Sequence, residues 1–152
     1  MPTTDCGASS PAALEVHGPT LSVRIAFGEP TADNTYPALV YAGATQSCID
    51  SVLAVALSLP IIDRVEVSGV QGRDEHNVCL ARVNVPSLDW TKTGRFIVVD
   101  ILDGDQLHAA ILGREFLSGF CMMYEGRIGT VVLSNDVPAF GEPGDTQEGT
   151  PE

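Results

Sequence analysis

Short segments with the pattern of β-strands recur along the chain, and this recurrence limits the possible folds more than any other feature. Apolar and polar residues alternate, or β-branched residues cluster, in six segments of six to ten residues. They are LSVRIAF (21–27), YPALVYA (36–42), RVEVSGV (64–70), NVCLARVNVP (77–86), GRFIVVDIL (94–102) and GTVVLS (129–134). A chain with this pattern is expected to fold into a mainly β domain.

Two other segments favour short helices. SVLAVALSL follows Ser47 and Asp50, either of which is a suitable N-cap, and it stops before Pro60. The second segment, REFLSGF, ends near Gly119. Each segment comes after an apolar strand and a glycine, in ALVYAG and in AAILG. We therefore expect two similar strand–glycine–helix units that pack as a pseudo-symmetric pair.

The length and composition of the chain indicate one domain with a buried core, since it has 152 residues, of which 44% are hydrophobic. We expect an irregular leader at residues 1–19 and the folded domain at residues 20–134. Residues 135–152 are rich in Pro, Gly, Asp and Glu, so we expect an acidic, disordered tail there.

The charge of the chain argues against some classes of partner. A net charge of −12 and the lack of a basic cluster argue against binding to nucleic acid or to an anionic membrane. No apolar segment approaches the roughly 20 residues of a membrane span, and the N-terminus lacks the features of a secretory signal. We therefore expect a cytoplasmic protein. Its scattered cysteines are expected to be reduced thiols, and neither a metal site nor a cofactor is predicted. These cysteines are Cys6, Cys48, Cys79 and Cys121.

Trp90 lies in the polar stretch SLDWTKTG. We interpret it as a partly exposed anchor in a loop, with contact to a partner as the alternative. Asp100, Asp103 and Asp105 lie near Gly104, but their spacing does not fit an EF-hand, so a solvated turn between strands is expected.

Four motifs occur in a defined order along residues 20–134. Ala38, Leu39 and Val40 form an apolar strand, Gly43, Ala44 and Thr45 form a small turn, Gly69 and Gly72 flank a hairpin tip, and Ile111, Leu112 and Gly113 precede a short helix. This ordered set resembles the retropepsin-like aspartic proteases, in which two half-sized subunits build one active site. The resemblance implies a closed antiparallel β-barrel with one or two short helices, assembled as a homodimer. Another small β-barrel remains the alternative.

The chain departs from the pattern of that family where the chemistry would lie. Tyr41 occupies the position of the catalytic aspartate, and Ala42 occupies that of the adjoining Thr or Ser. The family mechanism needs two carboxylates that share a proton, one of which acts as a base on water. A phenol stays protonated at neutral pH, and Ala42 lacks the hydroxyl that would bond across the dimer.

The resemblance and the departure together predict a catalytically inactive domain that acts as a dimeric module for binding a peptide or protein, or for scaffolding. Tyr41, Ala42 and Gly43 would form the degenerate catalytic turn. Gly69, Val70, Gln71 and Gly72 would form a flap over an extended peptide.

The alternative is an active aspartic endopeptidase that works through a heterodimer with an intact relative or through an unusual carboxylate. Asp50 is the obvious substitute carboxylate, although an N-cap role explains it without catalysis. A third possibility is that Tyr41 is an introduced change in a working enzyme.

Overall fold

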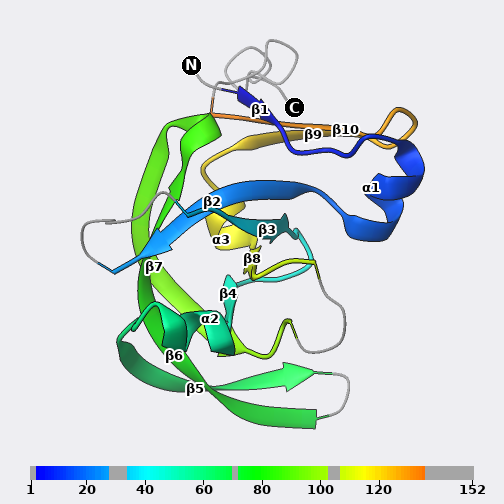
Figure 1. Cartoon of the computed structure of the whole chain (residues 1–152). Coiled ribbons are helices and arrows are strands. Elements are labelled where there is room, and N and C mark those ends of the chain that lie inside the picture. The colour runs from blue at the N-terminus through cyan, green and yellow to red at the C-terminus, as the bar shows by residue number, and fades with distance from the viewer. Residues whose placement is uncertain (1–2, 28–33, 70–71, 103–106, 136–152) are drawn as a thin grey trace, which may run out of the picture.

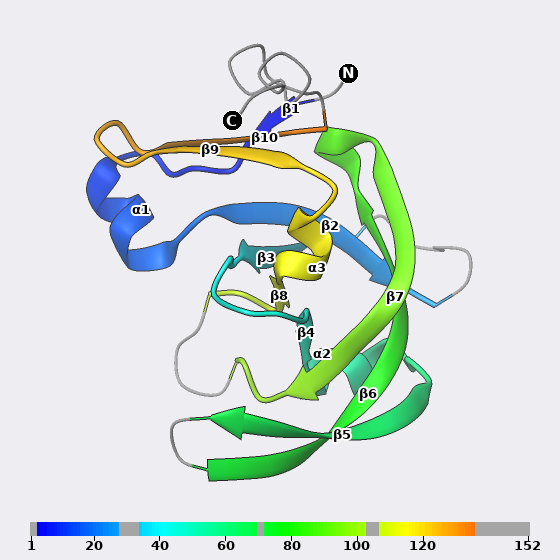
Figure 2. The same cartoon turned by 180° about the vertical axis from the view of Figure 1, so that it is seen from behind.

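The computed structural model describes residues 3–27, 34–69, 72–102 and 107–135, and these residues form mainly β-strands (Figure 1 and Figure 2). The strands are β1 (Thr3–Asp5), β2 (Thr20–Ala26), β3 (Tyr36–Val40), β4 (Cys48–Asp50), β5 (Ile61–Gly69), β6 (Gly72–Val85), β7 (Trp90–Val99), β8 (Ala110–Leu112), β9 (Cys121–Glu125) and β10 (Thr130–Ser134). The α-helices are α1 (Pro11–His17), α2 (Ser51–Ala56) and α3 (Arg114–Leu117), and η1 (Pro86–Leu88) is a 3-10 helix. The prediction of a mainly β domain is confirmed.

A seven-stranded sheet has the order β2-β3-β8-β4-β7-β6-β5. β3 is parallel to β8 and β4 is parallel to β7, while the other neighbours are antiparallel. The sheet is therefore mixed, whereas the sequence led us to expect antiparallel strands. The parallel pairs join segments far apart in the chain, which agrees with the long connections that parallel pairing requires.

β2 has two neighbours in this sheet because its halves pair with different strands. Residues 20–23 pair with β3, and Arg24 to Ala26 pair with β6, where Arg24 lies opposite Asn84. β2, the first strand in the order, thus also pairs with β6, the strand before the last.

The core is built from strands that bury every second side chain, as the period-two patterns predict. In β2 the buried residues are Leu21, Val23 and Ile25, each at most 5% exposed. In β6 the alternation runs through Cys79, Ala81, Val83 and Val85, each at most 2% exposed, and Val78 beside Cys79 is buried as well. Alternate residues of these two strands therefore supply much of the hydrophobic core.

A smaller sheet has the order β1-β10-β9 and lies beside the main sheet. Val131 and Leu133 of β10 are fully buried and belong to the same core cluster as the strands of the large sheet. β1 and β10 pair through Asp5 opposite Val132, so the two ends of the described chain meet in this sheet.

The first 19 residues, which we expected to be irregular, contain β1 and α1. Cys6 and Leu14 are each 1% exposed. Ser10 caps α1 by accepting a hydrogen bond from the backbone N–H of Ala13, and Pro11 occupies the first turn. α1 has only seven residues, so its sequence shows no clear helical periodicity. Helices this short are stabilised mainly by tertiary packing, which the sequence does not reveal.

From the sequence we expected the glycine-containing turn after β3 to lead directly into a helix. The structure differs, because β4 lies between that turn and α2. Asp50 is the N-cap of α2, which confirms one of the two residues considered for that role. None of the helices in the described residues is long and apolar enough to cross a membrane.

Candidate functional site

The turn after β3 places Tyr41 at the surface. The backbone N–H of Tyr41 donates to the carbonyl oxygen of Leu112 over 2.9 Å, and its carbonyl accepts from the N–H of Ala44 over 3.3 Å. The Tyr41 side chain is 49% exposed. Its ring lies over Gly43, where an added Cβ would come within 2.5 Å of the ring carbons. Gly43 therefore leaves room for the tyrosine ring in this position.

A second strand and glycine support this turn from β8. The N–H of Gly113 donates to Oγ of Ser47 over 3.1 Å. A Cβ on Gly113 would lie 2.8 Å from the carbonyl oxygens of both Ala44 and Gln46. Only glycine permits the two backbones to approach this closely, so the two strand–glycine units meet here.

Arg114 clamps the turn through its side chain and its backbone. Its Nη1 donates to the carbonyl oxygen of Ala42 over 2.7 Å, and its Nη2 donates to Oγ1 of Thr45 over 2.8 Å. Its backbone N–H donates to the carbonyl oxygen of Ala44 over 2.8 Å. The planar guanidinium thus binds two points of the turn at once, a role that lysine cannot reproduce.

Glu115 completes the support. Its Oε1 accepts a hydrogen bond from the backbone N–H of Ser47 over 2.7 Å, and its own N–H donates to the carbonyl oxygen of Thr45 over 3.3 Å. Ser47 is 2% exposed. The turn is therefore held mainly by groups of residues 113–115 and by backbone atoms. The sequence did not predict these roles, although the LGRE stretch after the second apolar strand was a visible signal.

The side chains of the turn carry little acid–base chemistry. Residues 41–47 read YAGATQS and contain no carboxylate, imidazole or amine. Their hydroxyls belong to Tyr41, Thr45 and Ser47, and those of Thr45 and Ser47 accept hydrogen bonds from Arg114 and Gly113. Tyr41 thus carries the exposed phenol at this turn, with no general base among its neighbours in the turn.

Asp50 has a structural role. Its Oδ2 accepts hydrogen bonds from the N–H groups of Val52 and Leu53 over 3.0 and 3.3 Å. Its Oδ1 accepts from those of Ile101 and Leu102 over 3.0 and 2.9 Å. Asp50 is 2% exposed. Both oxygens are occupied by backbone donors, so this carboxylate joins the start of α2 to the segment after β7.

The predicted flap corresponds to the hairpin of β5 and β6, in which Gly69 pairs with Gly72. Gly72 has a φ of 112°, a region that favours glycine. Val70 and Gln71 lie outside the described residues. Figure 1 and Figure 2 both place the end of this hairpin at which β5 finishes and β6 begins on the same side of the molecule as the turn after β3.

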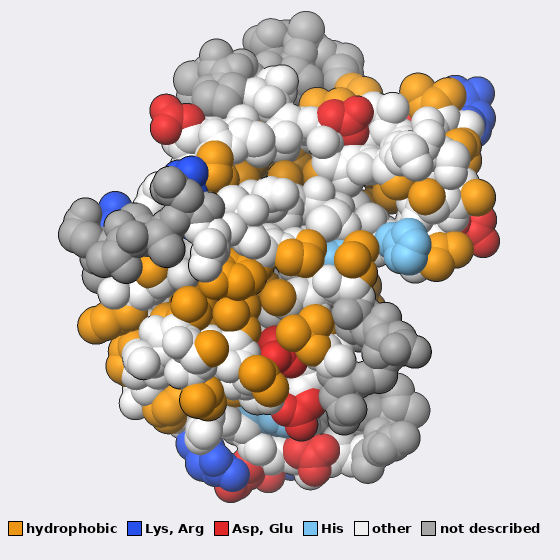
Figure 3. Space-filling model, viewed as in Figure 1, with side chains coloured by type: hydrophobic (Ala, Val, Ile, Leu, Met, Phe, Trp, Pro, Cys, Tyr) orange, Lys and Arg blue, Asp and Glu red, His pale blue; other side chains and the backbone are white. Residues whose placement is uncertain are grey.

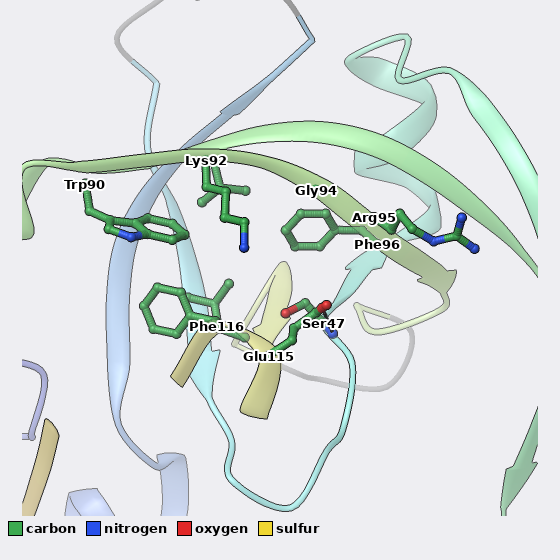
Figure 4. A pocket seen from close by; sticks show the side chains of 10 residues that line it. Ser47, Trp90, Lys92, Gly94, Arg95, Phe96, Glu115 and Phe116 are labelled. Atoms are coloured by element: carbon green, nitrogen blue, oxygen red, sulfur yellow. Dashed lines mark hydrogen bonds between the residues drawn. The ribbon is translucent and has the colours of Figure 1, made fainter. Parts of the chain in front are cut away.

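A pocket of about 80 Å³ lies next to the support of the turn, between β7 and α3 (Figure 4). Ser47 and Glu115 line it together with aromatic side chains. None of the predicted site residues lines this pocket. Trp90, one of its lining residues, begins β7 instead of lying in a loop, and it is half-buried.

The four cysteines are free thiols. Burial raises the pKa of Cys6 and that of Cys79 to about 11. A thiol with so high a pKa is protonated at neutral pH and is a poor nucleophile. Among the described residues, no group of His, Cys, Asp and Glu side chains is arranged to hold a metal ion.

Comparisons with known proteins show that the fold is similar to that of several solved structures, but they do not assign the chain to a family. No family model and no curated protein matches the chain. The chain is similar to the solved EIAV protease in complex with the inhibitor HBY-793, with a TM-score of 0.48 and 22% identity over 66% of this chain and 85% of that one.

Two other solved structures are similar at the same level. One is the simian foamy virus (mac) protease, with a TM-score of 0.46 and 14% identity over 65% of this chain and 91% of that one. The other is the retroviral protease-like domain of Ddi1 from Leishmania major, with a TM-score of 0.45 and 19% identity over 70% of this chain and 79% of that one. With TM-scores below 0.5 and identities below 25%, these similarities do not establish a family for the chain.

Proposed function

We propose that this chain is a retropepsin-like domain without the catalytic dyad, which acts as a dimeric module that binds an extended peptide or protein segment. The observation that carries the proposal is the turn after β3, which is braced in full by Gly113, Arg114 and Glu115 but presents Tyr41 and Ala42. The pairing of β2 with both β3 and β6 supports a closed barrel for this domain.

The side chains of the turn explain why this domain would have no peptidase activity. An aspartic peptidase activates water through two close carboxylates, of which only one is ionised. Two phenols in their place provide no base at neutral pH. Asp50 is not a substitute, because four backbone N–H groups bind its oxygens.

Binding of a peptide would use the hairpin of β5 and β6. β5 is the last strand in the order of the large sheet, so a peptide can pair with its free edge as an added strand. Exposed ion pairs join the two strands of the hairpin, namely Arg64 with Glu75 and Arg73 with Glu66. Charged side chains on an edge strand discourage non-specific aggregation.

Exposed apolar side chains support a homodimer. Tyr41 is 49% exposed, and Val52 and Val55 of α2 are 70% and 80% exposed. Figure 3 shows apolar side chains gathered over the part of the surface where α2 lies in Figure 1. Contiguous exposed apolar surface commonly marks a protein interface.

The test restores the missing groups. The Tyr41→Asp, Ala42→Thr variant and the unmodified protein are incubated with a peptide library from about pH 4 to about pH 7, a range that starts below the upper pKa of about 4.7 known for one such carboxylate dyad and covers higher values. We expect the variant to cleave, with inhibition by pepstatin, and the unmodified protein to be inactive. The matched control is Tyr41→Asn, Ala42→Thr, which has the same shape without the carboxylate.

Other outcomes would contradict the proposal. Cleavage by the unmodified protein would show that the catalytic group lies elsewhere. Cleavage by the asparagine control would show that the new carboxylate is not responsible. Sedimentation of the unmodified protein checks the dimer separately, and a monomer at all concentrations would contradict that part.

A further inference from the structure

The pocket between β7 and α3 has the size of a site for a single side chain, and its walls are largely apolar. Its volume of about 80 Å³ is far below the roughly 300–1,000 Å³ of sites for drug-sized ligands. The rings of Trp90 and Phe116 meet edge to face, with centroids 5.1 Å apart. Phe96 and Leu112 add further apolar surface. An aromatic side chain suits these walls.

A charged group at the rim adds a second requirement. Lys92 is exposed and projects between Trp90 and Phe96 (Figure 4). Within the described part of the chain, no group is hydrogen-bonded or ion-paired with the ammonium of Lys92. The other charges at the pocket are already engaged, since Glu115 binds the N–H of Ser47 and Arg95 binds Asp63 over 2.7 Å. The best occupant is therefore an aromatic residue with a nearby carboxylate.

The end of the described chain lies next to this pocket. Ser134, the last residue of β10, pairs with Cys121 of β9. The residue before Cys121 is Phe120, whose ring centroid lies 5.8 Å from that of Trp90. Figure 1 and Figure 2 both place the end of β10 beside the start of β7. The chain after Ser134 thus begins near the aromatic wall of the pocket.

The sequence that follows has the chemistry that the pocket requires. Residues 136–152 contain five acidic residues, no Lys or Arg, and one aromatic residue, Phe140. Phe140 is six positions after Ser134, and a chain reaches at most about 3.3–3.6 Å per residue, or roughly 20 Å over that length. Glu142 lies two positions further on. Phe140 is therefore within reach of the pocket.

We infer that the C-terminal segment is an intramolecular ligand of this pocket, with the ring of Phe140 in the pocket against its apolar walls and the carboxylate of Glu142 beside Lys92. Residues 136–152 lie outside the described residues, so the inference rests on the pocket, on the place where β10 ends and on the sequence. A short connection keeps the local concentration of the segment high, which favours docking within one chain over docking between chains. The inference does not depend on the proposed function.

Trp90 provides a direct test because it is the single tryptophan of the chain. A docked Phe140 shields the indole from water. In Phe140→Ala, we expect the tryptophan emission to shift to longer wavelength and the Stern–Volmer constant for quenching by acrylamide to rise. The matched control is Val137→Ala, an apolar truncation in the same segment, which should leave both quantities unchanged.

Reversal of the charges tests the contact between Lys92 and Glu142. Lys92→Glu should release the segment and raise quenching by acrylamide, because the rim of the pocket then repels the acidic segment. Adding Glu142→Lys to that variant should lower quenching again. Because both proteins carry the Lys92→Glu change, the comparison keeps the surroundings of Trp90 the same.

Three results would overturn the inference. Unchanged emission and quenching in Phe140→Ala would show that the pocket does not hold this ring. Equal quenching in the single and double charge variants would remove the contact between Lys92 and Glu142. Protection of Trp90 that is lost on dilution would assign the occupant to a second copy of the chain.

Discussion

The turn after β3 and the start of α2 are close in sequence, but they place their polar groups in opposite ways. At the turn, Tyr41 is 49% exposed and no carboxylate is present. At the start of α2, the carboxylate of Asp50 is 2% exposed and accepts four backbone hydrogen bonds. The acid in this part of the chain thus stabilises the fold, while the exposed turn carries no carboxylate.

The difference also shows which residues the fold depends on. The turn is bound through the carbonyls of Ala42 and Ala44 and through the side chains of Thr45 and Ser47. None of these bonds uses the side chain of Tyr41. The hydrogen bonds that hold the turn therefore do not depend on the side chain at position 41, whereas the start of α2 requires the carboxylate itself.

The largest expected effect comes from removing that carboxylate. Asp50→Ala leaves the N–H groups of Val52, Leu53, Ile101 and Leu102 without their acceptor. Each unpaired buried group costs about 1–3 kcal/mol, although some of them will reach water. We expect the free energy of unfolding to fall by roughly 3–5 kcal/mol, which urea denaturation measures.

The matched control is Asp100→Asn. Asp100 is exposed and accepts a hydrogen bond from Oγ of Ser51. Loss of its charge should cost less than about 1 kcal/mol. Equal losses in the two variants would show that Asp50 has no special role, and the contrast between the two regions would fail.

A smaller effect is expected at the contact between the two strand–glycine units. Gly113→Ala places a Cβ 2.8 Å from the carbonyl oxygens of Ala44 and Gln46, which are backbone atoms with little freedom to move. Overpacking of this kind costs about 1–3 kcal/mol. We expect that loss in urea denaturation, together with faster amide exchange in the turn.

Gly94→Ala serves as the comparison, because an added Cβ there meets nothing within 4 Å. That variant should be neutral or slightly more stable, since alanine restricts the unfolded chain. If Gly113→Ala is as stable as Gly94→Ala, the two units are not in tight contact, and the turn does not depend on the β8 unit.

Patterns that depend on neighbours in the chain were predictable from the sequence. Alternating residues indicated the strands, and Asp50 before an apolar run indicated an N-cap. Both signals follow from local geometry. The same reasoning placed Gly69 and Gly72 at a hairpin, where they pair.

Features that depend on tertiary contacts were not predictable. Arg114 looked like the first residue of a short helix, and nothing local indicated that its guanidinium binds the carbonyl oxygen of Ala42, 72 positions earlier. Trp90 lies in a polar stretch, yet it packs against Phe116 and Phe120 because β7 crosses α3. Leu14 is a single apolar anchor in a short helix, which gives no periodic pattern.

The smallest expected effect concerns a histidine between the two regions. The neighbour of His108, Ala109, accepts a hydrogen bond from the N–H of Asp50 and donates one to the carbonyl of Pro37 before β3 reaches the turn. His108 is 3% exposed, and its Nε2 lies 2.7 Å from Oγ1 of Thr20. Burial, and after it the charge of His17, lowers the pKa of His108 below its ordinary value of 6.5.

Because the folded state disfavours the charged imidazole, the unfolded state binds more protons as the pH falls below 6.5. The stability contributed by neutral His108 is therefore complete above that pH and is lost as the pH falls toward the folded pKa. His108→Gln, which can still bond to Thr20, should lack this loss. We expect the stability of the parent to decline more than that of the variant between about pH 8 and about pH 5.5 in urea denaturation. Parallel curves would show that the fold does not oppose protonation of His108. The segment before β8 would then tolerate a buried charge without the four hydrogen bonds that the carboxylate of Asp50 receives.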